Sequence, residues 1–526
     1  MRLKKTSLLI FSVLLFFVLA ACGGTNEEET TNEETTPDSS EESGGEIHVA
    51  VPAQPPTLDA QITVSSVALN ITRHIYETLV TLNEEYEPVP MLAESVDISD
   101  DSLTYTFVLR EGLTFHNGEP VTTEDVEASM NRWLETSSRA KLLLAGAGFE
   151  ATDDSTVILQ LEERAADVLD IMAGQSEFPA IMPKDVVEAA DATGVTEYIG
   201  TGPFQFEEWA QDQYILLSKF EDYVSREEER SGLSGKKEAL VDEIYFQIVT
   251  DPFTRVSGLQ TGSYDIADEI PFDNYAQVSQ MSGIETHLYL NRTLTWFYNI
   301  NEGPMADQKM REAVNTAINL DDLLLFAYAD EDLFETHPGY MNLAQVNWSN
   351  TEGEESYNVN DPERAKELLE EAGYDGEELV IITTRDYDYM YKAALSVQEQ
   401  LQAIGMNVKV DNYDLATFLE LKTDPGAWDM LAAGTGYVTI PAQLLALNPG
   451  FAGTDDPVAQ EMLQEVRSAE TPEEAYERWE ELQAYLYDFL STTVMGHQHD
   501  IIATSEKVEG FEPFQAPILW GTKIVE

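Results

Sequence analysis

The chain has 526 residues, with 97 Asp and Glu against 29 Lys and Arg, and its formal net charge at pH 7 is −68. Because nucleic-acid binding needs clustered Lys and Arg that neutralise phosphates, this charge excludes DNA and RNA as partners. Hydrophobic residues make up 43% of the chain and aromatic residues 10%, which is enough to build a large core, so the chain as a whole is not disordered.

The first 21 residues have the layout of a secretory signal peptide. Arg2, Lys4 and Lys5 precede an apolar run from Leu8 to Leu19, and two alanines follow. A basic start, a short apolar segment and small residues at the cleavage point are typical of such a peptide. The run is shorter than the roughly 20 residues of a membrane-spanning helix. We therefore predict that residues 1–21 are removed on export.

Cys22 is the only cysteine of the chain and follows this segment directly. The stretch Leu19-Ala20-Ala21-Cys22 resembles the bacterial lipobox, in which the cysteine is diacylated and the signal peptide is cut just before it. A free thiol would be unusual in an exported chain, and lipidation converts it to a thioether. Cys22 is therefore a predicted lipidation site that anchors the protein to a membrane.

Residues 22–45 predict a tether between this anchor and the folded part. From Gly23 to Glu46 the sequence holds Gly, Thr, Asn, Ser, Pro and nine acids, with no basic residue and no apolar residue. A segment of this composition has nothing to bury and should stay extended and disordered. The folded part should begin near residue 46.

Strand patterns begin soon after the tether. Apolar residues alternate with others over residues 103–109, and the same alternation recurs over residues 244–248. A period of two is the pattern of a strand with one buried face. These segments are predicted strands.

Helical patterns are interspersed with the strands, over residues 122–134, 361–373 and 471–490. In the second segment Asp361 is the expected N-cap, and Pro362 stands at the first helical position before an apolar stripe. Strands and helices that alternate along the chain predict a mixed α/β fold with several lobes.

Catalytic and metal-binding signatures were sought next. The sequence contains neither G-x-S-x-G nor H-E-x-x-H, and it has seven histidines but no cysteine pair. We therefore predict that the protein is not an enzyme, with an extracellular hydrolase of unknown type as the alternative, and that it holds no cofactor and no resident metal.

His497 and His499 form a local cluster in the stretch MGHQHD. In a strand, residues two apart point to one face, so both imidazoles could reach the same cavity and bind a metal or a carboxylate. Two polar residues on a solvated strand face are the alternative.

A second cluster is TTRDYDYMYK, which follows a predicted strand at residues 379–383. A cation and three tyrosines at the carboxyl end of a strand are typical lining of a cleft in α/β proteins. Arg385 and Tyr387 are the candidates there. The alternative is that Asp386 starts a surface helix.

Eight phrases, in this order over about residues 50–430, carry a family resemblance: PPTLDA, HIYETLV, LREGLTFHNGEPVTTEDV, GTGPFQFEEW, VDEIYFQIVTDPFTRVSGLQTGSYDIAD, KMREAVNTAINLDDL, NDPERAKELLEEAG and VQEQLQAIGMNVKV. Together they resemble the extracellular solute-binding proteins of family 5, the oligopeptide-, dipeptide- and nickel-binding receptors of ABC importers. The resemblance implies a two-lobed clamp of the periplasmic-binding-protein type (type II, cluster C), with a hinge of two crossing strands and an extra subdomain in the first lobe.

The family's architecture implies boundaries on this chain. The first lobe would comprise residues 46–85, 200–290 and 495–526. The extra subdomain would be residues 86–199, and the second lobe residues 291–494.

The resemblance also implies a mechanism and a location. The solute binds in the cleft, the lobes close by hinge motion, and the closed form delivers the solute to the ABC permease, which works with its ATPase subunits. With the lipobox, it implies a monomeric lipoprotein anchored at the outer face of a Gram-positive-type cell membrane.

The expected ligand site departs from the peptide-binding pattern. Relatives that bind peptides usually carry an acid after the Trp-Asp strand, but here Gly434 to Tyr437 follow, with no acid before Asp455. Either other groups meet the peptide's termini, with Arg385 for a carboxylate, or the ligand is a metal chelate, an opine, a sugar or another non-peptide solute.

Peptides are the preferred interpretation of this site. The ligand-binding residues that follow from the resemblance and the two clusters are Val64, Arg385, Tyr387, Gly434, Tyr437, His497 and His499.

Overall fold

The computed structural model describes residues 44–448, 451 and 456–525. The predicted signal peptide, Cys22 and nearly all of the tether therefore lie outside the described residues. Within the described ranges, no helix combines the length and the apolar character that a membrane crossing requires.

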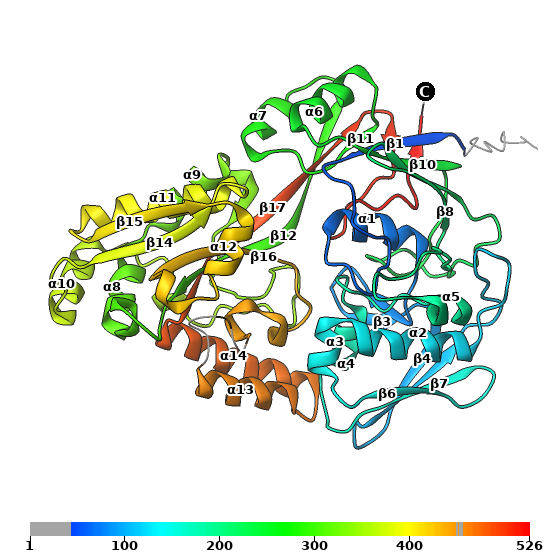
Figure 1. The fold of residues 1–526 in the computed structure, drawn as a ribbon, viewed down its shortest axis with the longest axis horizontal. Helices are drawn as coiled ribbons and strands as arrows, with labels where there is room; N and C mark the ends of the chain where they lie inside the picture. Colours follow the sequence, from blue (N-terminus) through cyan, green and yellow to red (C-terminus); the bar gives the residue numbers. More distant parts are fainter. Residues whose placement is uncertain (1–43, 449–450, 452–455, 526) are drawn as a thin grey trace, which may run out of the picture. The chain divides into compact units, whose positions relative to one another are not determined.

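A large mixed sheet runs through the fold, in the strand order β15-β14-β16-β12-β17-β11-β1-β10-β9-β8 (Figure 1). The first half of the sheet contains β1 (Glu46–Val51), β8 (Phe204–Ala210), β9 (Tyr214–Lys219), β10 (Glu243–Ile248) and β11 (Ile266–Ala267). Its helices are α1 (Ser66–Ile75), α6 (Pro252–Thr261) and α7 (Tyr275–Val278).

The second half of the sheet contains β14 (Glu378–Thr384), β15 (Asn407–Tyr413) and β16 (Met430–Gly436), and the short β13 (Phe334–Glu335) pairs with β17. Its helices are α8 (Gln308–Ala317), α9 (Leu320–Tyr328), α10 (Pro362–Ala372), α11 (Asp388–Ala403), α12 (Leu415–Leu421), α13 (Pro457–Arg467) and α14 (Pro472–Phe489). β18 (Val508–Glu509) and β19 (Lys523–Ile524) form a separate pair near the end of the chain.

Two long strands join the halves, β12 (Ile284–Tyr298) and β17 (Thr492–Ser505), which pair antiparallel along most of their length (Figure 1). The register shifts between Leu290 and Arg292, so Asn291 is an extra residue in β12. Such a bulge bends a strand and changes the direction of its side chains. The bulge lies in the middle of the connection between the halves.

A smaller sheet, in the order β4-β5-β7-β6, is built from residues inserted between β1 and β8. This region contains β2 (Val80–Leu82), β3 (Pro88–Pro90), β4 (Ala93–Ile98), β5 (Thr104–Leu109), β6 (Gly148–Ala151) and β7 (Thr156–Gln160). Its helices are α2 (Thr123–Thr136), α3 (Ser138–Leu143), α4 (Val168–Ala173) and α5 (Lys184–Ala189).

The predicted strands and helices are confirmed where local signals were strong. The Asp361 side chain accepts a hydrogen bond from the backbone N of Arg364, Pro362 is the first residue of α10, and Gly373 ends the helix at φ 74°. In β5 the side chains of Tyr105 and Phe107 are buried as the alternation predicts.

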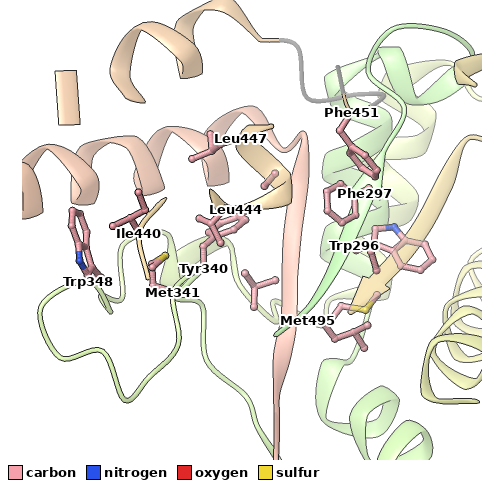
Figure 2. Packing of buried hydrophobic residues seen from close by; sticks show 14 of the residues in the cluster. Trp296, Phe297, Tyr340, Met341, Trp348, Ile440, Leu444, Leu447, Phe451 and Met495 are labelled. Atoms are coloured by element: carbon pink, nitrogen blue, oxygen red, sulfur yellow. The ribbon is translucent and has the colours of Figure 1, made fainter. Parts of the chain in front are cut away.

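The core of the second half packs against both connecting strands (Figure 2). Trp296 and Phe297 of β12 and Met495 of β17 are buried, and Phe451 packs against Phe297 with ring centroids 5.0 Å apart. Burying such large side chains stabilises the fold by about 2–3 kcal/mol each. The connecting strands are therefore anchored in this core where they enter the second half.

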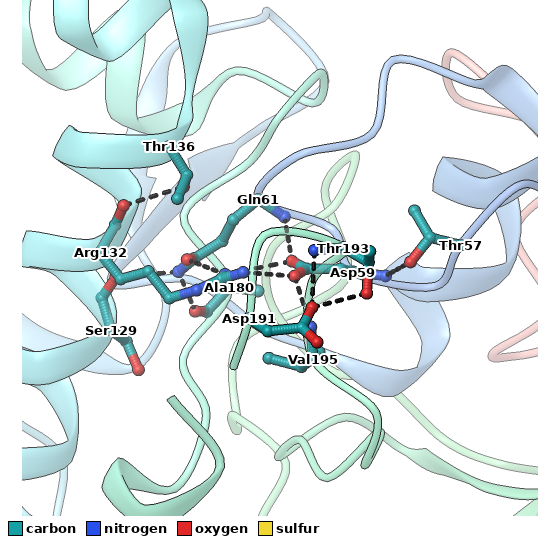
Figure 3. A network of polar contacts seen from close by, with 10 residues as sticks. All are labelled: Thr57, Asp59, Gln61, Ser129, Arg132, Thr136, Ala180, Asp191, Thr193 and Val195. Carbon is teal, nitrogen blue, oxygen red and sulfur yellow. Dashed lines mark hydrogen bonds and ion pairs between the residues drawn. The ribbon is translucent and has the colours of Figure 1, made fainter. Parts of the chain in front are cut away.

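The phrase PPTLDA is held by a buried ion pair to α2 (Figure 3). The Asp59 carboxylate accepts hydrogen bonds from the Arg132 guanidinium, from the backbone N of Val195 at 2.9 Å and from the backbone N of Gln61 at 3.1 Å. This network connects the segment after β1 to the inserted region and positions the loop that leads to α1.

Candidate ligand-binding cavity

A cavity of about 950 Å³ is lined by residues from both halves of the large sheet. Its walls come from the segment around α1, from α3, from the bulge of β12 and from the end of β16 with the loop that follows it. A volume near the upper end of the usual range of about 300–1,000 Å³ fits a solute larger than a single amino acid.

The bulge in β12 places Asn291 and Arg292 in the cavity wall. Both side chains contact Asp500 of β17, with Asn291 Nδ2 at 2.6 Å and Arg292 Nε at 3.4 Å from Asp500 Oδ2. The Asp500 carboxylate raises the pKa of Arg292, so this guanidinium remains charged. One ion pair between the connecting strands thus forms part of the wall.

Asp268 and Glu269 follow β11 directly, and sequence reasoning missed both. Asp268 is 1% exposed and accepts hydrogen bonds from Asn70 Nδ2 at 3.2 Å and from the backbone N of Glu269 at 2.9 Å. Burial, and then the charge of Glu269, raises the pKa of Asp268 to about 7. An acid pair directly after a short apolar strand was the available signal, because such strand ends line ligand sites.

The end of β16 has a free edge in the cavity wall. β16 pairs with β12 from Met430 to Gly436, but β14 pairs with it only at Met430 and Leu431. In the described part of the chain, no strand covers the second edge beyond Leu431. Thr435 and Gly436 line the cavity, so backbone N–H and C=O groups are available to an extended ligand.

Val64, Tyr387 and Tyr437 are the predicted ligand-binding residues that line the cavity. Val64 is 69% exposed, and Leu142 of α3 is another exposed apolar side chain in the same wall. Tyr437 packs on Tyr86 with ring centroids 5.0 Å apart. The cavity therefore offers apolar contacts beside its charged wall.

Two hydrogen-bond donors in the cavity wall lack partners among the described residues. The Arg139 guanidinium of α3 forms no ion pair or hydrogen bond there, and burial lowers its pKa although the charge of Glu177 opposes this. The amide Nε2 of Gln515 is buried without an acceptor. Both groups can donate to a carbonyl or a carboxylate of a solute.

Arg385 and Gly434 do not line the cavity. The Arg385 guanidinium lies over the Tyr391 ring, 4.2 Å from its centroid, and donates a hydrogen bond to its hydroxyl. A Cβ on Gly434 would lie 2.1 Å from the hydroxyl oxygen of Tyr389. The glycine thus makes room for a packed tyrosine.

Neither His497 nor His499 lines this cavity. His497 is wholly buried, with Nδ1 3.2 Å from Thr293 Oγ1, and burial lowers its pKa to about 3. His499 Nε2 lies 3.5 Å from Glu335 Oε1. The alternative of a solvated strand face is wrong for His497, whereas the His499 side chain is 20% exposed.

The interpretation of Asp386 as a helix start is also wrong. α11 begins at Asp388, with Tyr387 at the N-cap position, and the Asp386 carboxylate accepts a hydrogen bond from the backbone N of Leu415 at 2.7 Å. Asp386 therefore connects this turn to α12.

No set of three His, Cys, Asp or Glu side chains is arranged to hold a metal ion within the described ranges.

Comparison with protein families identifies the group to which the sequence is similar. The sequence model described as "Bacterial extracellular solute-binding proteins, family 5 Middle" matches residues 87–453. This stretch contains most of the eight phrases that carry the resemblance.

Two curated relatives match along much of their length. The probable peptide ABC transporter periplasmic-binding protein y4tO of Sinorhizobium fredii is 28% identical over 484 residues, covering 88% of this chain and 90% of that protein. The glutathione-binding protein GsiB of Salmonella typhi is 28% identical over 378 residues, covering 70% of each chain.

A solved structure with the same fold is the ABC transporter substrate-binding protein CtaP of Listeria monocytogenes. It superposes with a TM-score of 0.81 at 22% identity, covering 92% of this chain and 100% of that chain. The predicted α/β fold of the two-lobed binding-protein type is thereby confirmed.

Proposed function

The chain belongs to the bacterial extracellular solute-binding proteins of family 5, and on that premise we propose that it captures peptides outside the cell for an ABC importer. The S. fredii relative is described as a peptide-transporter component, and GsiB is described as a protein that binds glutathione, itself a tripeptide. These relatives support a peptide over a metal chelate, an opine or a sugar.

The observation that carries the proposal is the free edge of β16 in the cavity wall. A peptide in extended conformation can add to such an edge through main-chain hydrogen bonds, whatever its side chains. Sugars and chelates lack the regular alternation of N–H and C=O that this edge offers. The geometry at Thr435 and Gly436 therefore favours a peptide backbone.

The other walls fit the rest of a peptide. Val64, Tyr387 and Tyr437 are the proposed contacts for its side chains, and Arg139 and Gln515 are the proposed donors to its carbonyl and carboxylate oxygens. Because water is excluded when the cavity closes, each of these polar contacts gains strength.

Capture without chemistry is the proposed mechanism. The proposed lobes, divided at residues 290/291 and 494/495, meet at the connecting strands β12 and β17 and close around the peptide. The closed form then docks on the permease and its ATPase subunits as a monomer, and no bond of the peptide is made or broken.

A lipid anchor at Cys22 is part of the same proposal. Two acyl chains hold a protein firmly, since each buried methylene contributes about 0.8 kcal/mol. The acidic segment after Cys22 then spaces the receptor from the membrane. Cys22→Ser should release the protein into the medium or leave it unprocessed, and continued acyl labelling of that variant would contradict the anchor.

A library experiment tests the proposed function. The purified full chain is unfolded and refolded to remove retained ligand, mixed with tripeptides to pentapeptides, and read by native mass spectrometry and thermal unfolding. We expect bound masses that match peptides, and about 2.7 kcal/mol of stabilisation at a free ligand concentration of 100 times Kd. If no peptide mass is retained and the melting temperature does not move, the proposal is wrong.

Two matched variants locate the binding. Val64→Glu places a charge in the cavity wall, whereas Val346→Glu makes the same change at a 70% exposed valine outside the cavity. We expect the first variant to weaken peptide binding at least tenfold, about 1.4 kcal/mol, and the second to leave it unchanged. A peptide with N-methylated backbone amides should bind weakly to the wild type, because it cannot pair with β16.

A further inference from the structure

A second cavity of about 510 Å³ adjoins the first. Glu269, Arg292 and Tyr387 line both, so a ligand in the first cavity can extend into the second. The second cavity lies where the loop after β11, the start of α11 and the strand β17 meet.

Most charges in the second cavity are already paired. Lys392 Nζ lies 3.0 Å from Asp273 Oδ1 and 2.8 Å from Asp388 Oδ2. Asp500 is contacted by the Arg292 guanidinium, as described above. Lys392 thus faces two carboxylates and Arg292 faces one, so these contacts leave no cation in excess.

Glu269 and Asp386 are the acids that remain, and the Asp386 carboxylate accepts a hydrogen bond from the backbone N of Leu415 at 2.7 Å. Among the residues that the structure describes, no cation forms an ion pair with the Glu269 carboxylate, and Ser66 is its side-chain hydrogen-bond partner. Arg255 contacts only the backbone oxygen of Glu269, at 2.8 Å. Burial, and then the charge of Asp500, raises the pKa of Glu269. The charges of Arg292 and Arg255 oppose this shift, so the junction of the two cavities has a carboxylate without an ion-pair partner among the described residues.

Gln498 provides an independent observation in the same cavity. Its side chain is 2% exposed and donates its amide N–H to Asp500 Oδ1, while its amide oxygen accepts no hydrogen bond among the described residues. An unmet buried acceptor costs about 1–3 kcal/mol. A group that enters this cavity and donates hydrogen bonds would remove that cost.

We propose that the second cavity is a subsite for a protonated amine of the ligand, with Glu269 as its counter-charge and the Gln498 amide oxygen as a further acceptor. The inference rests on the proposed peptide-binding function and adds the direction in which the peptide lies across the two cavities. The donors of Arg139 and Gln515 line the first cavity and the buried Gln498 amide oxygen lines the second, with Glu269 where the two adjoin, so the amine enters the second cavity while carbonyl and carboxylate groups stay in the first.

Four peptides test this subsite: Ala-Ala-Ala and Ala-Lys-Ala, each with a free and with an acetylated amino terminus. Isothermal titration of the wild type should show at least tenfold tighter binding of free Ala-Ala-Ala than of its acetylated form. If acetylated Ala-Lys-Ala retains tight binding, the lysine side chain occupies the subsite, and if it does not, the amino terminus does.

Paired variants identify the carboxylate. Glu269→Gln should lose at least tenfold in affinity for free Ala-Ala-Ala but not for its acetylated form. Glu285→Gln makes the same change on an exposed position of β12 and should leave all four affinities unchanged. Gln498→Met is a second variant of the subsite, and it should lower the affinity only for peptides that carry a free amine.

The outcomes separate this inference from the proposed function. Equal affinities of free and acetylated forms, or equal losses in the Glu269 and Glu285 variants, overturn the subsite while peptide binding stands. If none of the four peptides binds the wild type, the subsite is overturned too, and the wider peptide library decides the proposed function by itself.

Discussion

Ligand capture should depend on an ion pair that joins the inserted region to the second half of the molecule. Arg467, the last residue of α13, contacts Asp167 at the start of α4, with Nε 2.9 Å from Oδ2 and Nη2 3.3 Å from Oδ1. Nη2 also donates to the Leu143 carbonyl oxygen at 2.7 Å. This pair lies away from β12 and β17, so it can form only when the two regions are together.

The size of the effect follows from the geometry. The side chains of Arg467 and Asp167 are 16% and 4% exposed, and hydrogen bonds to charged groups contribute about 1.5–3 kcal/mol. If the open form hydrates both groups, Arg467→Met removes this amount from the closed form alone. Because ligand binds the closed form, we expect an affinity loss of about 10- to 150-fold for free Ala-Ala-Ala.

A double-mutant cycle measures this contribution. Titrations of Arg467→Met, Asp167→Asn and the double variant should give a coupling energy of about 1.5–3 kcal/mol in ligand binding. The exposed pair Arg364 and Glu367, with nitrogen and oxygen 2.8 Å apart on α10, is the matched control and should give less than about 1 kcal/mol. A coupling energy for the first pair no larger than for the control would refute the reasoning.

Three further predictions concern stability, each measured by urea denaturation. Gly434→Ala should cost about 1–3 kcal/mol because its Cβ would overlap the Tyr389 hydroxyl, and Tyr389→Phe should restore part of the loss; an unchanged midpoint would contradict the close packing. Because burial lowers the pKa of His497 to about 3, its stabilising contribution is present above pH 6.5 and is lost as pH falls toward 3. His497→Gln should therefore remove about 2–3 kcal/mol of the stability difference between pH 7 and pH 4.5, and an identical pH profile in the variant would exclude this role. Lys237→Met leaves the buried Glu77 carboxylate without the ammonium that now lies 3.0 Å away, and it should lower the free energy of unfolding by about 3–5 kcal/mol. Changing both Lys237 and Glu77 to methionine should cost less than the single change. A double variant that is less stable than Lys237→Met would show that the two side chains are not coupled.

Local elements of the fold could be read directly from the sequence. The helix between Asp361 and Gly373 begins and ends where its cap residues stand, because capping involves only neighbours in the chain. The strand β5 followed from its alternation for the same reason. The family resemblance led from these segments to the two-lobed α/β fold, which the match to the family and to a solved structure confirmed.

The placement of the candidate site residues was harder to predict. Val64, Tyr387 and Tyr437 reach the cavity, but Arg385 stacks on Tyr391 outside it. His497, two residues from His499, lies in the interior of the fold. The direction of a side chain at a strand end depends on what packs beside it, and that is not encoded in the neighbouring residues.

The sequence by itself determined the acidic composition, the caps and periodicities of its helices and strands, and the family. Only the tertiary structure decided which groups meet in the cavities. Glu269 after β11, Arg292 at a bulge and Gln498 in β17 come together because strands more than 200 residues apart pair in one register. A shift of one residue would turn these side chains to the opposite face, so the charges of the site are a property of that pairing.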